Sequence, residues 1–138
     1  MTNPWRVWKA LKLAEHYIGI RYKWAGKTPA GFDCSGLVCE LLQSVGLLPD
    51  KTTLSSRGLY AKYKDRTVDT PHAGCLLFYG RSKITHVAIA LDNELMIEAG
   101  GGDSRTKQLV DAILRRAFVR RRRINRRSDL VAVCDPFQ

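Results

Sequence analysis

The 138-residue sequence has few features of a metal, disulfide or membrane protein. Its four cysteines, Cys34, Cys39, Cys75 and Cys134, include no Cys-x-x-Cys pair and are too few for a disulfide scaffold. We therefore expect no metal ion and no cofactor. No stretch approaches the roughly 20 consecutive apolar residues that cross a bilayer, so no membrane span is expected.

The sequence also begins without a secretory pattern. Its first residues, Met-Thr-Asn-Pro-Trp-Arg, lack the charged start, apolar centre and small-residue cleavage site of an export signal. This predicts synthesis in the cytosol with no export signal of its own. The length is typical of one domain, and no linker or repeat divides it, so we expect a single catalytic domain over 1–138.

Acidic residues are scarce beside basic ones. The chain has 23 Lys and Arg against 13 Asp and Glu, a formal net charge of +10. Such an imbalance favours anionic partners, among them nucleic acid, anionic lipid and phosphate-bearing cell surfaces. Arginines are densest in the segment Arg115–Arg127.

Helical spacing dominates the first half of the chain and strand alternation the second. Asn3 and Pro4 predict the start of a helix that Gly19 ends, with Trp5 and Trp8 in the core. A loop is expected at 21–32, further helices at 34–46, 54–63 and 106–114, and strands at 75–79, 86–91, 95–99, 118–124 and 130–134. Helices followed by antiparallel strands indicate the α+β class.

Cys34 stands where a loop becomes a helix, in the run Gly-Phe-Asp-Cys-Ser-Gly. The first turn of a helix has unpaired N–H groups and the positive end of the dipole, which stabilise a thiolate and can receive an oxyanion. Cys34 is thus the candidate nucleophile. The alternative is a buried filler of a small gap, which the polar neighbours Asp33 and Ser35 disfavour. The other three cysteines are expected in the core.

The sequence offers only three histidines as the base that a thiol nucleophile needs. His16 belongs to the first helix and His72 to a turn, so both are expected at the surface. His86 begins an apolar strand, and we interpret it as the base. The alternative is a hydrogen-bonded histidine at a strand end.

Glu98 is an acidic residue inside an apolar strand, and it is the candidate partner that orients His86. The two residues are an even number of positions apart. A three-residue hairpin loop, for example 91–93, would place them opposite each other on one face. A two-residue turn at Asp92 and Asn93 would place Glu98 on the far face, where it would meet solvent.

Three sequence blocks carry a resemblance to a known family. The run YKWAGKTPAGFDCSGLV at 22–38 resembles the signature of the NlpC family of papain-like cysteine peptidases, and PHAGCLLF at 71–78 and THVAI at 85–89 resemble its next two blocks. The resemblance implies a papain-like fold with a nucleophile helix packed on an antiparallel sheet that bears the base. It also implies hydrolysis of peptidoglycan stem peptides, usually between D-glutamate and the diamino acid.

Carried over to this sequence, the resemblance implies that Cys34 is the nucleophile, His86 the base and Glu98 the third polar member. The sequence departs from the family at three positions. Ala25 replaces a glycine, Cys75 stands where aspartate is frequent, and Glu98 stands where histidine is commonest.

The resemblance also implies a substrate site formed by Tyr22, Asp33 and Ser35, where the carboxylate can pair with a peptide amine. Tyr22 and the backbone N–H of Cys34 are the expected oxyanion donors.

A cell-wall substrate requires delivery from the cytosol, which a bacteriophage particle or lysate would supply. The segment 117–137 resembles phage-encoded relatives. We therefore expect a protein that is virion-associated or released to the cell wall. The Arg115–Arg127 segment is either a solvated edge strand or a face that holds an anionic wall polymer, with nucleic acid as an incidental ligand.

Two other functions stay open. Papain-like folds of this type also include acyltransferases and amidases that use a Cys–His pair on lipids or small amides. A non-catalytic basic binding module is the second alternative.

Overall fold

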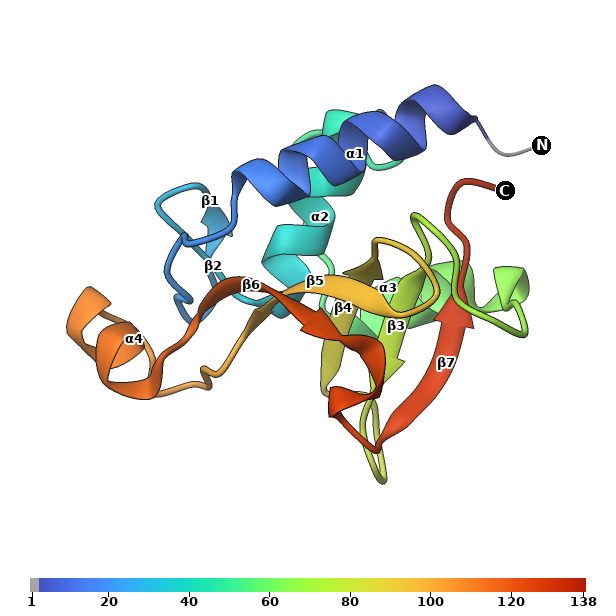
Figure 1. Ribbon diagram of the computed structural model, residues 1–138. Helices are drawn as coiled ribbons and strands as arrows, with labels where there is room; N and C mark the ends of the chain where they lie inside the picture. Colours follow the sequence, from blue (N-terminus) through green and yellow to red (C-terminus); the bar gives the residue numbers. More distant parts are fainter. Residues whose placement is uncertain (1–2) are drawn as a thin grey trace.

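The computed structural model describes residues 3–138 (Figure 1). Helix α1 (Pro4–His16) begins as predicted, because Asn3 Oδ1 accepts hydrogen bonds from the first free backbone N–H groups, that of Trp5 at 3.1 Å among them. Gly19, with a φ of +98°, lies just beyond its end.

The prediction that Trp5 and Trp8 belong to the core is wrong. Their side chains are 65% and 51% exposed and stack on each other with ring centroids 5.1 Å apart. Helix α1 instead buries Val7, Ala10 and Ala14. This stripe keeps the helical period but lies two positions further along, on the side of the helix opposite the tryptophans, and its small side chains let α1 approach the next helix of the chain.

The helix that carries Cys34 follows a short hairpin that the sequence did not predict. Strands β1 (Lys27–Thr28) and β2 (Gly31–Phe32) pair within the segment expected to be a loop. Helix α2 (Cys34–Ser44) begins directly after β2, and helix α3 (Ser56–Tyr63) is followed by the short 3-10 helix η1 (Lys64–Arg66).

The second half of the chain forms a five-stranded antiparallel sheet in the order β6-β5-β4-β3-β7. A helix, α4 (Leu109–Arg115), connects β5 to β6, and the 3-10 helix η2 (Ile124–Arg126) follows β6. The α+β class and the packing of N-terminal helices on an antiparallel sheet are confirmed. The strands are β3 (Leu76–Tyr79), β4 (His86–Ala90), β5 (Leu95–Gly100), β6 (Phe118–Arg123) and β7 (Leu130–Cys134).

Both faces of the sheet are buried, by different sets of side chains. One face packs against apolar residues of α2 in a cluster that includes Cys39 and Cys134, and the other face holds Cys75. All three cysteines are therefore core residues, as predicted. Among the described residues, no helix combines the length and apolar character needed to cross a membrane.

Strand β6 lies at the edge of the sheet. Its first residues also bond to the segment after α1, since Val119 N donates to Ile20 O at 2.8 Å. In the part of the chain that the structure describes, its arginine half, 120–123, pairs with β5 alone. The edge position agrees with the first of the two interpretations of the arginine segment.

Candidate active site

Cys34 is the first residue of α2, and its side chain is partly exposed in a cleft. Asp33 caps the helix, with its Oδ1 accepting a hydrogen bond from Gly36 N at 2.7 Å. This cap fixes the turn from which Cys34 projects. The backbone N–H groups that precede Gly36 in the first turn have no partners within the helix, so they are available near the thiol.

His86 is the first residue of β4 and is buried. Its Nε2 lies 2.7 Å from Oε1 of Glu98. Because a carboxylate only accepts hydrogen bonds, Nε2 carries a proton, and Nδ1 is the ring nitrogen left for Cys34. The structure therefore brings together the three residues that were singled out in the sequence.

Of the two hairpins left open by the sequence, the β4–β5 hairpin has the three-residue loop, but its turn lies at a different position. Ile89 pairs with Ile97, and Leu91 N donates to Leu95 O at 2.8 Å, so the loop is 92–94 and not 91–93. By this register Glu98 of β5 lies opposite residue 88 of β4. His86 is two positions before residue 88 and shares its face of the sheet, so Glu98 contacts His86 as a diagonal cross-strand neighbour. The turn lies one position later because Asp92 Oδ1 accepts hydrogen bonds from the backbone N–H groups of residues 94 and 95, both at 2.7 Å.

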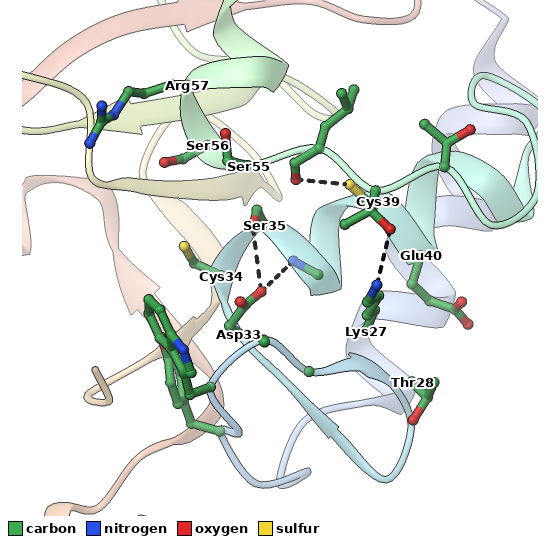
Figure 2. Close-up of a pocket in the computed structure, with 18 of the residues that line it drawn as sticks. Lys27, Thr28, Asp33, Cys34, Ser35, Cys39, Glu40, Ser55, Ser56 and Arg57 are labelled. Carbon is green, nitrogen blue, oxygen red and sulfur yellow. Dashed lines mark hydrogen bonds between the residues drawn. The ribbon is translucent and has the colours of Figure 1, made fainter. Parts of the chain in front are cut away.

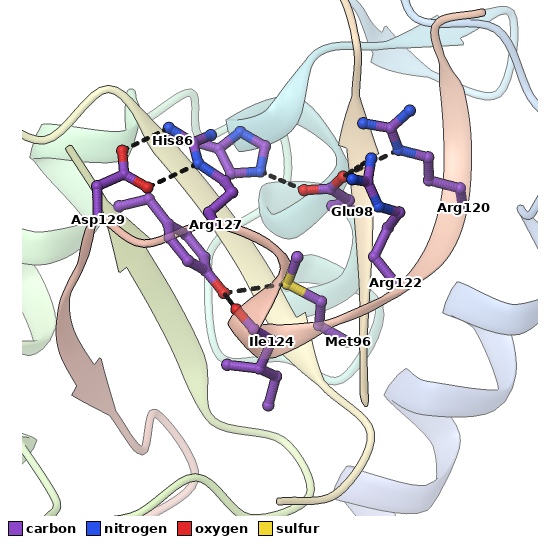
Figure 3. A network of polar contacts seen from close by, with 9 residues as sticks. His86, Met96, Glu98, Arg120, Arg122, Ile124, Arg127 and Asp129 are labelled. Carbon is purple, nitrogen blue, oxygen red and sulfur yellow. Dashed lines mark hydrogen bonds and ion pairs between the residues drawn. The ribbon is translucent and has the colours of Figure 1, made fainter. Parts of the chain in front are cut away.

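The second oxygen of Glu98 is held by arginines of β6 (Figure 3). Arg120, directly opposite Glu98 in the β5–β6 ladder, donates from Nε to Oε2 at 2.9 Å. Arg122 Nη1 lies 3.6 Å from the same oxygen. A Cβ on Gly100 would lie 2.5 Å from Oε2, so glycine at this position leaves the space that the pair occupies.

This network favours charge on both Glu98 and His86. Burial opposes ionisation of Glu98, but hydrogen bonds from His86 and Arg120 outweigh it and lower the pKa of Glu98 to about 2. Burial likewise disfavours a charged His86, but hydrogen bonding to Cys34 and Glu98 raises the pKa of His86 to about 9. At neutral pH the site thus holds a carboxylate beside a protonated imidazole ring.

Tyr22 closes the site on the side of β5. Its ring packs over Gly102, where a Cβ would overlap it. Burial, followed by the charges of Cys34 and Asp33, raises the pKa of Tyr22, so the phenol keeps its proton and can donate a hydrogen bond.

Asp33 and Ser35 flank Cys34 at the start of α2 (Figure 2). Ser35 Oγ donates to Asp33 Oδ1 at 3.4 Å. Burial raises the pKa of Asp33, although the hydrogen bonds from Gly36 and Ser35 act in the opposite direction. One oxygen of the carboxylate thus serves as the helix cap, and both side chains line the cleft.

Two cavities meet at Cys34. The larger, of about 1030 Å³, runs along the start of α2 and the segment before α3. The smaller, of about 340 Å³, lies on the side of His86 and Glu98. Both are lined by Tyr22, Cys34 and Thr85, so a bound chain can cross the thiol from one to the other.

Within residues 3–138, one cluster outside the cleft has side chains suited to a metal ion. His72, Cys75 and Asp135 offer ligand atoms within 4.8 Å of one another. The His72 and Asp135 side chains already bond at 2.7 Å, and Asp135 also accepts from Phe137 N. Burial raises the pKa of Cys75 to about 11, which disfavours the thiolate that a metal needs. We interpret the cluster as a structural tie for the C-terminal segment.

Sequence reasoning missed Arg120 and Arg122. It treated the arginines of 120–123 as one exposed group, but alternation divides them. Arg121 and Arg123 are 49% and 69% exposed and pair with acidic residues away from the site, at 3.3 and 3.8 Å. Arg120 and Arg122 are 29% and 25% exposed and face Glu98. Side chains along a strand point alternately to opposite faces, so Arg120 and Arg122 share one face of β6. The pairing of β6 with β5 then shows that this face meets Glu98.

Solved structures share this fold. The structure is similar to that of the peptidoglycan hydrolase RipB from Mycobacterium tuberculosis, with a TM-score of 0.76 and 25% identity over 98% of this chain and 66% of that one. The NlpC/p60 domain of the peptidoglycan hydrolase SagA gives a TM-score of 0.69 at 27% identity, covering 94% of this chain and 97% of that domain.

Curated proteins with similar sequences include cell-wall endopeptidases. The chain is 34% identical over 94 residues to the bifunctional muramidase/DL-endopeptidase CwlT of Bacillus subtilis, which is 64% of this chain and 28% of CwlT. It is 32% identical over 97 residues to the probable peptidoglycan endopeptidase LytE of the same organism, 67% of this chain and 27% of LytE. The chain thus spans less than a third of the length of these curated relatives. The model of the NlpC/P60 family matches residues 19–123, and the chain therefore belongs to the NlpC/P60 family.

Proposed function

We propose that this protein is a cysteine peptidase that hydrolyses amide bonds in the stem peptides of bacterial peptidoglycan. The observation that carries the proposal is the arrangement of Cys34, His86 and Glu98 at the meeting point of two cavities, in a chain of the NlpC/P60 family. The relatives named as peptidoglycan endopeptidases support the same substrate class.

In this mechanism His86 already holds the proton of Cys34 at Nδ1 at neutral pH, which leaves Cys34 as a thiolate, and Glu98 stabilises the imidazolium through Nε2. The thiolate attacks the carbonyl carbon of the scissile amide. The backbone N–H of Cys34 and the phenol of Tyr22 donate hydrogen bonds to the oxyanion.

The tetrahedral intermediate collapses when His86 gives its proton to the leaving amine, and a thioester to Cys34 remains. His86 then removes a proton from water, which attacks the thioester and releases the new carboxylate. No metal or cofactor is needed for either half of this cycle.

Asp33 and Ser35 are proposed as the site for the free amine of the stem peptide. They line the larger cavity next to Cys34, and a carboxylate there can pair with an ammonium group. Asp33 and Ser35 are the direct neighbours of Cys34, so an amine bound there would lie close to the scissile bond, which agrees with cleavage between D-glutamate and the diamino acid.

The test is digestion of several purified peptidoglycans, with the new termini identified by mass spectrometry. New D-glutamate carboxyl termini and diamino acid amino termini are the expected products. Transfer of acyl groups to lipid or amine acceptors without new peptide termini would instead favour the acyltransferase alternative. Binding without any product would favour the non-catalytic module.

We further propose that the protein reaches its substrate by release from a virion or a lysed cell. The proposal rests on the resemblance of the segment 117–137 to phage-encoded relatives. Fractionation of infected or lysing cultures, followed by detection of the protein in particles and in wall fragments, tests it.

A further inference from the structure

The smaller cavity, of about 340 Å³, has an unusual concentration of positive charge. Four arginines, Arg120, Arg122, Arg126 and Arg127, line it together with Glu98. It opens on the thiol, because Cys34 and His86 also belong to its wall.

Two of these arginines already have strong partners. Arg120 donates to Glu98 at 2.9 Å. Arg127 forms a two-point pair with Asp129, at 2.9 and 2.7 Å, and lies over the ring of Tyr79. Their charges are balanced within the protein.

The other two arginines are not balanced in this way. Arg122 reaches only Glu98, at 3.6 Å, and shares that oxygen with Arg120. Within residues 3–138, no carboxylate forms an ion pair with Arg126. The cavity therefore has more guanidinium groups than carboxylates to neutralise them.

The neighbouring arginines disfavour charge on one another. Burial, followed by the charge of Arg120, lowers the pKa of Arg122, and Arg126 and Arg127 act in the same direction. An anion in the cavity would relieve this repulsion. On the opposite face of β6 the situation differs, since Arg121 and Arg123 each pair with a glutamate.

We infer that this cavity is an anion subsite in which Arg122 and Arg126 hold a carboxylate of the substrate peptide beside Cys34. The inference rests on the proposed function and deepens it, because stem peptides carry carboxylates close to the scissile bond. A guanidinium group matches a carboxylate in planar, two-point geometry. The larger cavity holds the amine end of the peptide, so the two charges of the substrate lie on opposite sides of the thiol.

Alkylation of Cys34 tests the subsite without requiring hydrolysis. Iodoacetate is anionic and iodoacetamide is neutral, and both react with the same thiolate, so the ratio of their rates cancels changes in thiolate fraction. Sites of alkylation are assigned by peptide mass mapping. We expect the iodoacetate to iodoacetamide ratio to fall at least threefold in Arg126→Gln and in Arg122→Gln, and salt to lower the ratio in the wild type more than in either variant.

Arg123→Gln is the matched control. Arg123 is on the same strand but on the opposite face, and its loss removes the same charge. Its ratio should remain that of the wild type. An equal fall of the iodoacetate to iodoacetamide ratio in all three variants would show that the net positive charge of the protein attracts iodoacetate, and would overturn the subsite. A ratio that does not change in Arg126→Gln and Arg122→Gln would also overturn it.

A peptide pair identifies the source of the anion. Two substrates are compared: a stem peptide with its free carboxylate, and the same peptide with that group converted to a carboxamide. In Arg126→Gln the KM of the carboxylate peptide should rise roughly tenfold, and the KM of the carboxamide peptide should change little. If the alkylation ratio responds but the two peptides lose equally, the carboxylate assignment is overturned. If no peptide is cleaved at all, the proposed function fails while the alkylation result still decides the subsite.

Discussion

Glu98 and Arg120 lie directly opposite each other on neighbouring strands, and Arg120 Nε donates to Glu98 Oε2 at 2.9 Å. The other oxygen, Oε1, bonds to His86 at 2.7 Å. The carboxylate is thereby fixed from both sides. The family resemblance implied histidine at the position of Glu98, and the arginines of β6 explain how a charged residue is held there.

Cys34→Ala should abolish cleavage and leave the fold intact. The substitution removes the thiol from a partly exposed helix start and takes away little packing. Product analysis by mass spectrometry and circular dichroism check the two parts. Cys39→Ala, Cys75→Ala and Cys134→Ala are the comparison set, and cleavage that depends on one of them while Cys34→Ala stays active would contradict the assignment.

Glu98→Ala should lower kcat by roughly ten- to a hundredfold, the range typical for loss of an orienting partner. Glu98→Gln should retain more activity because it keeps an acceptor for His86. It also removes the negative charge that helps raise the pKa of His86 to about 9, so the alkaline limb of its pH–rate profile should move to lower pH. If the pH–rate profiles of Glu98→Ala and Glu98→Gln both superimpose on that of the wild type, Glu98 does not orient His86.

Arg120→Gln should reduce kcat by roughly tenfold with a smaller change in KM, because it frees Glu98 Oε2 and loosens the orientation of His86. Arg121→Gln is the control, since Arg121 lies on the other face and pairs with Glu15. The two variants are compared by measuring kcat and KM on one soluble stem peptide. A loss of the same size in both variants would point to net charge and not to positioning.

The Glu98–His86 pair should make stability depend on pH in a defined window. The pKa of Glu98 is lowered from 4.5 to about 2, so its contribution is complete above pH 4.5 and is lost as the pH falls toward 2. The pKa of His86 is raised from 6.5 to about 9, so its contribution is complete below pH 6.5 and is lost as the pH rises through 9.

The free energy of unfolding of the wild type should therefore exceed that of Glu98→Gln most between pH 4.5 and 6.5, by on the order of 3 kcal/mol. Urea titrations at a series of pH values measure the difference. A difference that is constant from pH 3 to 9 would show that the two side chains are not coupled.

The outer arginines offer a separate prediction about wall polymers. Changing Arg121 and Arg123 to glutamine should weaken sedimentation with whole cell walls and flatten its salt dependence, because these side chains are exposed. Turnover of a small soluble stem peptide should not change. Unaltered sedimentation at low salt would leave these arginines with the role of a solvated edge.

Local patterns in the sequence were enough to predict where Cys34 and His86 lie, because a capped helix start and an apolar strand are encoded by adjacent residues. The length of the β4–β5 hairpin loop was left open between two and three residues, because the position of its turn depends on hydrogen bonds made by the Asp92 side chain. Trp5 was assigned to the wrong face of α1 because the buried face was inferred from the largest apolar side chains. The structure buries the small side chains of Ala10 and Ala14 instead.

The arginines beside Glu98 could not have been identified from local patterns. Their register against β5 is set after a long connection through α4, and nothing in the residues of β6 alone fixes which of them face inward. Alternation predicts two sets, but only the tertiary pairing decides which set meets the carboxylate.

Among the described residues, the arginine half of β6 has a hydrogen-bonded neighbour on one side only. Such a segment opens at a lower free energy than the central strands, and its opening withdraws Arg120 from Glu98 while α2 still holds Cys34 in place. Hydrogen exchange at 120–123 and the rate of peptide cleavage should thus change together as the temperature rises, ahead of the cooperative transition of the core. We therefore expect the contact between Arg120 and Glu98 to be lost at a lower temperature than the packing of the central strands.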